Sequence, residues 1–162
     1  MRPTKLALLT TLMAVLAFPW AVEAVGRAKP AAQGKEEPAK REDSEKTIST
    51  IIRQMQMDLE SSSSRGVLNN IDSAKFDDYP RFEDMIEQLA RENSLRVFFR
   101  QVSNSIRENS AQTILEAEME MTRKDSAGQA ERRRQQLVID FELTSRGWKI
   151  INITPRDFFR PL

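Results

Sequence analysis

The apolar residues of this 162-residue chain change their spacing near Ser94, and this change constrains the fold more than any other feature. Before Ser94 they recur every three or four residues, as they do on one face of an amphipathic helix. After Ser94 they recur every second residue, as they do on one face of a half-buried strand. Helices followed by a run of strands predict an α+β fold, in which the helices cover one face of a curved antiparallel four-stranded sheet.

Two amphipathic helices are expected before the change in spacing. The first begins with Asp43 or Ser44 as its cap and ends at the serine run 61–64. Its apolar stripe consists of Ile48, Ile51, Ile52, Met55 and Leu59. The second helix spans residues 81–92, directly after Pro80. Its apolar face consists of Phe82, Met85, Ile86 and Leu89. A short apolar patch over residues 67–71 lies between the two helices, as another helical turn or a pinned loop.

Four strands are expected to follow as an antiparallel meander. Their ranges are 95–106, 115–121, 136–143 and 148–154, and Pro155 ends the last strand. In the middle hairpin we expect Glu120 opposite Arg134, Arg123 opposite Glu131 and Leu115 opposite Ile139. Opposite charges on neighbouring strands stabilise a pairing by roughly 0.2 to 1 kcal/mol each. The charged residues therefore predict a solvated outer sheet face, with a nucleic-acid or heparin patch at residues 132–134 as the alternative.

The first 24 residues have the composition of a secretory signal peptide. Arg2 and Lys5 precede an apolar run over residues 6–18, and Val22 and Ala24 occupy the two positions that signal peptidase reads. We expect cleavage after Ala24 and an exported protein, periplasmic or secreted, without a stable membrane anchor. An uncleaved anchor is the alternative, but the apolar run is shorter than the roughly 20 residues that span a bilayer.

The remaining chain is expected to have two parts. Residues 25–42 are rich in Pro, Ala and charged side chains and predict a disordered linker. Residues 43–162 form the folded domain. Removing residues 1–24 leaves equal numbers of basic and acidic residues, and this neutral balance disfavours nucleic acid and anionic membranes as partners.

The composition excludes several kinds of site. The chain has no His and no Cys, which rules out Ser–His–Asp and Cys–His catalysis, histidine or thiolate metal sites and disulfides. We therefore expect no cofactor, no metal and no catalytic residue. Asp77 and Asp78 beside Tyr79 offer the alternative of an acid–base cluster, or more simply a solvated loop that caps the following helix.

The closing sequence resembles a known family. Arg146-Gly147-Trp148-Lys149-Ile150-Ile151-Asn152-Ile153 is similar to the Gly-Trp-Lys/Arg-Ile final strand of bacterial proteins in the nuclear transport factor 2-like superfamily, also called SnoaL-like or cystatin-like cone folds. Residues 154–159 and Tyr79-Pro80-Arg81-Phe82 resemble segments of secreted bacterial members of unknown function. The resemblance covers residues 43–159. It implies a curved sheet wrapped around a helix, with a conical pocket that members use for catalysis, ligand binding or dimerisation.

Six side chains are candidates for a pocket or an interaction surface. They are Tyr79, Phe82, Met119, Trp148, Phe158 and Phe159. We expect Phe158 and Phe159 to seal the mouth of the cone, with docking on a partner as the alternative.

The expected function is that of an exported, non-catalytic binding or protein-interaction domain. Its partner would be a small apolar ligand or a protein, and strand 148–153, which is apolar on both faces, predicts a homodimer. The alternative is a small hydrolase or isomerase that uses Tyr79 with Asp77 or Asp78 in the cone pocket. A third possibility is a chaperone-like factor that binds apolar peptides near Phe158 and Phe159.

Overall fold

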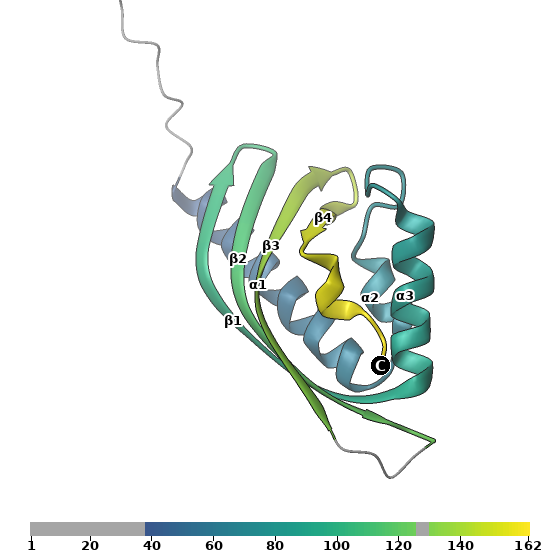
Figure 1. Cartoon of the computed structure of the whole chain (residues 1–162). Helices are drawn as coiled ribbons and strands as arrows, with labels where there is room; N and C mark the ends of the chain where they lie inside the picture. Colours follow the sequence, from purple (N-terminus) through teal and green to yellow (C-terminus); the bar gives the residue numbers. More distant parts are fainter. Residues whose placement is uncertain (1–37, 126–129) are drawn as a thin grey trace, which may run out of the picture. The chain divides into compact units, whose positions relative to one another are not determined.

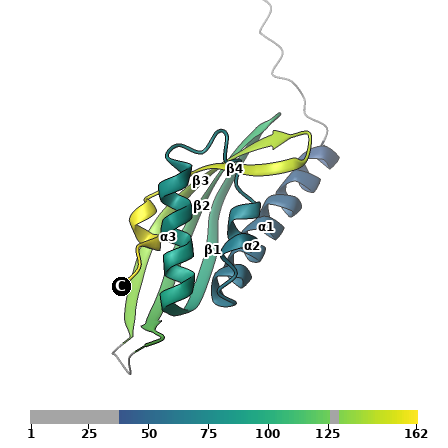
Figure 2. The ribbon, with the colours of Figure 1, turned by 90° about the vertical axis from the view of Figure 1, so that its right-hand side faces the viewer.

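The helices of the described domain cover one face of a curved sheet (Figures 1 and 2). The structure, a computed structural model, describes residues 38–125 and 130–162, so the predicted signal peptide lies outside the described residues. The elements are α1 (Pro38–Glu60), α2 (Ser64–Asn69), α3 (Tyr79–Glu92), β1 (Asn93–Arg107), β2 (Ser110–Arg123), β3 (Glu131–Thr144), β4 (Gly147–Thr154) and the 3-10 turn η1 (Arg156–Phe159). Within these ranges no helix is long and apolar enough to cross a membrane.

The sheet is a four-stranded meander in the order β1-β2-β3-β4, with every neighbouring pair antiparallel. Figure 1 shows the strands bending around α1, which crosses their concave face. The predicted α+β class and strand order are confirmed. The change in residue spacing predicted them because helices with one apolar stripe bury it most readily against a sheet that has one apolar face.

Helix α1 starts earlier than its apolar stripe indicated. It begins at Pro38, whereas Asp43 or Ser44 was the expected cap. The extra turn is stabilised by ion pairs spaced four residues apart, from Lys46 to Glu42 at 2.8 Å and from Arg41 to Glu45 at 3.7 Å. The expectation was wrong because this turn is solvated, so it has no apolar residues that would mark it as helix.

The register of the β2–β3 hairpin differs from the predicted one by two residues. Glu120 lies opposite Arg132 rather than Arg134, and Leu115 lies opposite Leu137 rather than Ile139. A slip of two residues leaves each side chain on the same face of the sheet, and the outer face still pairs glutamates with arginines. Alternation and charge therefore predicted the faces correctly but could not distinguish between the two registers.

The space between the helices and the sheet is filled by the protein's own side chains. Among the fully buried ones are Ile48, Met55 and Leu59 of α1, Phe82, Ile86 and Leu89 of α3, Leu115, Met119 and Met121 of β2, Leu137, Ile139 and Phe141 of β3, and Phe158 and Phe159 of η1. Burying each such side chain contributes roughly 1.5 to 3 kcal/mol before the entropy of ordering is counted. The interior of the cone is therefore a core.

The two outer edges of the sheet are covered in part. Along β1, the side-chain oxygens of Glu60 and Gln56 accept hydrogen bonds from the backbone N–H groups of Val97 (3.0 Å) and Phe99 (3.3 Å). Along β4, the Ile150 backbone bonds in both directions to residues 70–72, the loop after α2. This second contact fixes the loop beside the β3–β4 turn, where it forms one wall of the cavity described next.

Candidate functional site

Five of the six predicted site residues are buried in the core, and of these Phe82 also lines a small cavity of about 220 Å³ beside Met85 and Arg156. Phe158 and Phe159 are fully buried, and their rings lie 5.1 Å apart at the centroids. Phe159 also contacts Phe82 edge to face at 5.7 Å. Met119 is fully buried and Trp148 is 6% exposed. That Phe158 and Phe159 seal the mouth of the cone stays a prediction, as does a role for any of these residues in binding.

The acidic residues near Tyr79 do not converge on the cone. The side chain of Asp77 is 95% exposed, and the N-cap residue Asp78 makes no capping bond but lies 3.9 Å from Arg81. The Tyr79 hydroxyl donates to Glu83 at 3.4 Å. Burial, together with the charge of Glu83, raises the pKa of Tyr79 above its ordinary value, so this phenol is neutral at pH 7.

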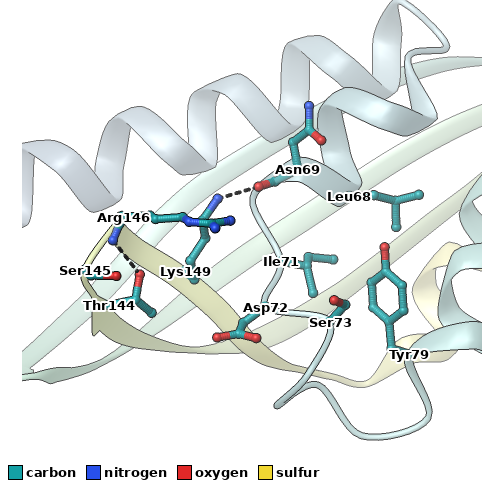
Figure 3. A pocket seen from close by; sticks show the side chains of 10 residues that line it. All are labelled: Leu68, Asn69, Ile71, Asp72, Ser73, Tyr79, Thr144, Ser145, Arg146 and Lys149. Carbon is teal, nitrogen blue, oxygen red and sulfur yellow. Dashed lines mark hydrogen bonds between the residues drawn. The ribbon is translucent and has the colours of Figure 1, made fainter.

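A polar cavity of about 560 Å³ lies outside the cone, between α2, the loop after it and the β3–β4 turn (Figure 3). Its apolar wall consists of Leu68, Ile71 and Tyr79. Its polar wall consists of Asn69, Asp72, Ser73, Thr144, Ser145, Arg146 and Lys149. Tyr79 is thus the one predicted site residue that lines this cavity.

The β3–β4 turn places Arg146 at the cavity. The Thr144 hydroxyl donates to the Gly147 carbonyl at 2.8 Å and accepts from the Arg146 N–H at 3.1 Å. Gly147 has a φ of 97°, a left-handed conformation that a side chain would strain. These local bonds fix the backbone conformation of the turn, and with it the position from which the Arg146 side chain extends.

Lys149 is placed at the same cavity by a bond to α2. Its Nζ donates to the Asn69 carbonyl at 2.5 Å. The residue opposite Lys149 on β3 is Glu142, but this carboxylate bonds to Lys75 at 2.5 Å instead. That hydrogen bond is the main reason why the pKa of Lys75 is raised. The Lys149 ammonium therefore lies at the cavity wall without a bond to Glu142, whose carboxylate bonds to Lys75.

Sequence reasoning missed the polar part of this cavity. Arg146 and Lys149 belong to the segment that resembles the family's final strand, but that resemblance concerned the fold. Asn69 and Asp72 lie in a segment expected only to be a helical turn or a loop. The missing signal is the contact between Lys149 and Asn69, which are 80 positions apart in the chain.

The outer sheet face carries the expected ladder of arginine and glutamate. Arg100 and Arg134 both pair with Glu116, and Arg132 pairs with Glu118. The hydrogen bond from Arg100 lowers the pKa of Glu116. On strand β1 two large apolar side chains are exposed, Phe98 on this face at 61% and Val102 at the β-bulge at 52%.

In the part of the chain that the structure describes, no three carboxylates lie close enough together to bind a metal ion. Asp140 lies on the outer face, and its carboxylate accepts hydrogen bonds from Gln112 at 2.9 Å and Asn152 at 3.1 Å. These two bonds explain Asp140 as part of the hydrogen bonding between strands.

The fold is similar to that of several solved structures. A nuclear transport factor 2-like superfamily protein from Salmonella enterica aligns with a TM-score of 0.63 at 8% identity over 70% of this chain and 89% of its own. A protein with a cystatin-like fold from Novosphingobium aromaticivorans aligns at 0.56, with 10% identity over 71% and 82%. A candidate dehydratase of the same family from Streptomyces avermitilis aligns at 0.55, with 11% identity over 69% and 94%.

Sequence comparison adds no relative to these structural ones. No protein-family model matches the chain, and no curated protein matches it. At such low identities the structural similarity establishes the fold, and a fold of this kind serves catalysis in some proteins and binding in others. The described domain has the nuclear transport factor 2-like fold, as the resemblance of its closing strand predicted.

Proposed function

We propose that this chain is a non-catalytic binding domain whose site is the cavity between α2 and the β3–β4 turn. The observation that carries the proposal is the filled cone. Proteins with this fold include a candidate dehydratase, so the fold itself allows catalysis. Here the cone holds buried side chains such as Met119 and Phe159, and the polar groups near Tyr79 do not meet inside it. The open polar cavity beside it remains available to a ligand.

The chain offers built-in reporters for the two sites. The methyl groups of Met55, Met119 and Met121 lie in the cone and are fully buried, whereas Met57 is 53% exposed on α1. The backbone amides of Ser73, Ser145 and Gly147 report on the cavity and its turn. Spectra of the full chain, labelled at methionine methyls and at backbone nitrogen, separate binding in the cone from binding in the cavity.

The test is a titration with a mixed library of amino acids, sugars, sugar phosphates and fatty acids. We expect the amides of Ser145 and Gly147 to shift while the methyl of Met119 stays in place. Met57 controls for non-specific contact with the surface. A shift of the Met119 methyl without a change at Ser145 would contradict the proposal. Turnover of a library compound that is lost in Tyr79→Phe or Asp78→Asn would favour the hydrolase or isomerase alternative.

Export is part of the proposal and is supported by the amino-terminal sequence. The charged start, the apolar run over residues 6–18 and the small residues Val22 and Ala24 support removal of residues 1–24. Expression of the full chain in a bacterial host, followed by intact-mass measurement of the periplasmic fraction, should show a protein that begins at Val25. A full-length mass in the cytoplasmic fraction would contradict export.

Self-association is proposed for the outer sheet face, where Phe98 is exposed. Burying this ring against a second copy would remove apolar surface from water. Sedimentation equilibrium at micromolar concentration should show a dimer that Phe98→Ser converts to a monomer. A wild-type monomer at that concentration would count against self-association and would leave the cavity proposal unchanged.

A further inference from the structure

We infer that the cavity between α2 and the β3–β4 turn takes a small organic anion, whose carboxylate or phosphate group is held by Arg146 and Lys149. This inference rests on the proposed function, because it names the chemistry of the ligand for the same site. It is carried by the charges that line the cavity and by the hydrogen bonds that place them.

The first observation concerns Arg146. Its side chain is exposed at the tip of the β3–β4 turn, and among the described residues no carboxylate lies within 4.0 Å of its guanidinium. Other arginines of the sheet, such as Arg100 and Arg132, have a glutamate partner. A guanidinium presents a planar fork of donors that matches the two oxygens of a carboxylate or phosphate. Arg146 is therefore free to bind such a group.

The second observation concerns Lys149. Its ammonium has three donors, and one of them bonds to the Asn69 carbonyl. This bond holds the ammonium at the wall of the cavity and leaves two donors for another acceptor. Glu142, which lies opposite on β3, would neutralise Lys149 if its carboxylate were free, but it bonds to Lys75. Figure 3 shows the side chains of Arg146 and Lys149 both extending toward the end of α2.

The third observation concerns Asp72, which is the one acidic residue that lines the cavity. Its Oδ1 accepts a hydrogen bond from the Ala74 N–H at 3.1 Å. Figure 3 shows its carboxylate directed away from the two cationic side chains. Two positive side chains and one negative one leave the lining with a net positive charge, so an anion is favoured over a neutral or cationic molecule.

The volume and the remaining lining agree with a small organic molecule. A cavity of about 560 Å³ is within the usual range of roughly 300 to 1,000 Å³ for small-molecule sites. The hydroxyls of Ser73 and Ser145 line it and can bond to polar groups on the rest of the molecule. The ring of Tyr79 forms part of the apolar wall.

The test compares three probes that share one scaffold: glucuronate, glucose 6-phosphate and glucose. Titration of the full chain, followed by the amide shifts of Ser145 and Gly147, should show that at least one anionic probe binds ten-fold or more tightly than glucose. The stronger of the two anions identifies the preferred group, carboxylate or phosphate. Arg146→Gln and Lys149→Gln should each weaken that anion ten-fold or more. Arg53→Gln, which removes an exposed arginine from α1, is the matched control and should change nothing.

Three results would overturn the inference. Glucose could bind as tightly as both anions, the Arg146 and Lys149 variants could leave the affinity unchanged, or neither anion could bind below 10 mM, a limit that corresponds to roughly −3 kcal/mol. These results would leave the proposed function standing if library compounds still shift the amide of Ser145. A probe that shifts the methyl of Met119 instead would count against the proposed function itself.

Discussion

Of the two glycines that the structure describes, Gly66 is the one at which an added side chain would collide with its neighbours. A Cβ atom at this position of α2 would lie 2.4 Å from Cγ and from Oδ1 of Asp58. The Asp58 carboxylate cannot move aside freely, since it is buried and its Oδ1 accepts from Gln54 at 3.0 Å. Glycine in a helix is less favourable than alanine by about 1 kcal/mol. Here the absence of a side chain leaves room for Asp58, so that α2 can pack closely against the end of α1.

Gly66→Ala should therefore destabilise the domain although it improves helix propensity. We expect a loss of about 1 to 3 kcal/mol in the free energy of unfolding, because crowding a packed site costs more than the propensity gain. In an Asp58→Ala background the same change should be neutral or stabilising, since the crowded carboxylate is gone. Urea unfolding of the four proteins of this cycle measures the coupling, and additive effects would show that the close approach does not matter.

Tyr79 gives a second test at the residue scale because it is the one tyrosine of the chain. Burial and the nearby Glu83 raise its pKa, so the folded protein should ionise at a higher pH than the unfolded chain, whose tyrosine titrates near pH 10. Stability from this group is fully present below pH 10 and is lost as pH rises through the folded pKa. Absorbance at about 295 nm follows the phenolate in native and in denatured protein.

Glu83→Gln should move the native titration toward the denatured one, since it removes the neighbouring charge and leaves the burial in place. Glu45→Gln, a change on exposed α1, is the control and should have no effect. If the native and denatured titrations coincide, Tyr79 is not shielded and the apolar wall of the cavity is open to water.

At the scale of elements, two side chains of α1 bond to the edge of β1, where a fifth strand could otherwise pair. Side-chain oxygens of Glu60 and Gln56 accept hydrogen bonds from backbone N–H groups that a neighbouring strand would otherwise use. Exposed sheet edges invite pairing with other chains, and side chains that satisfy the edge prevent it. The helix thus covers the concave face and protects part of the edge at the same time.

Glu60→Ala should expose the Val97 amide, and we expect a loss of about 1 kcal/mol, as for a typical hydrogen bond. Glu60→Gln keeps an acceptor oxygen at the same position and should retain most of the stability. Hydrogen exchange at Val97 should quicken in the alanine variant and stay slow in the glutamine variant. Equal exchange in both variants would mean that the bond from Val97 to Glu60 does not protect this edge.

At the scale of the whole molecule, residue spacing predicted the elements and their faces, but it did not predict how distant elements meet. The apolar stripe of α1 and the alternation along β2 identify which side chains are buried, because burial repeats with the period of the backbone. A β2–β3 hairpin shifted by two residues has the same alternation of apolar and charged side chains. The sequence therefore could not show which arginine lies opposite Glu120. The cavity was missed for a related reason, since Asn69 and Lys149 meet through the fold alone.

The predicted site residues show that a single sequence does not distinguish core residues from site residues. Large aromatic residues such as Phe82 and Phe159 attract attention in a sequence, but their most frequent use is to fill a core. Arg146 resembles any solvated arginine until the fold shows that it lines a cavity and has no carboxylate beside it among the described residues. A site made of ordinary surface residues carries no signal in a single sequence.

The carboxy-terminal turn η1 contributes two fully buried rings, Phe158 and Phe159, to the core. If η1 is an integral part of the core, removing one of these rings should destabilise the whole domain. Phe159→Ala removes a fully buried ring between Phe82 and Phe158, and such a change costs roughly 3 to 5 kcal/mol. Met57→Ala removes an apolar side chain from α1, where it is 53% exposed, and should change the free energy of unfolding by less than about 0.5 kcal/mol. Urea unfolding of the two variants compares them directly. If both variants lose little free energy of unfolding, η1 is not packed firmly into the core in solution. The interior of the cone would then be accessible to ligands.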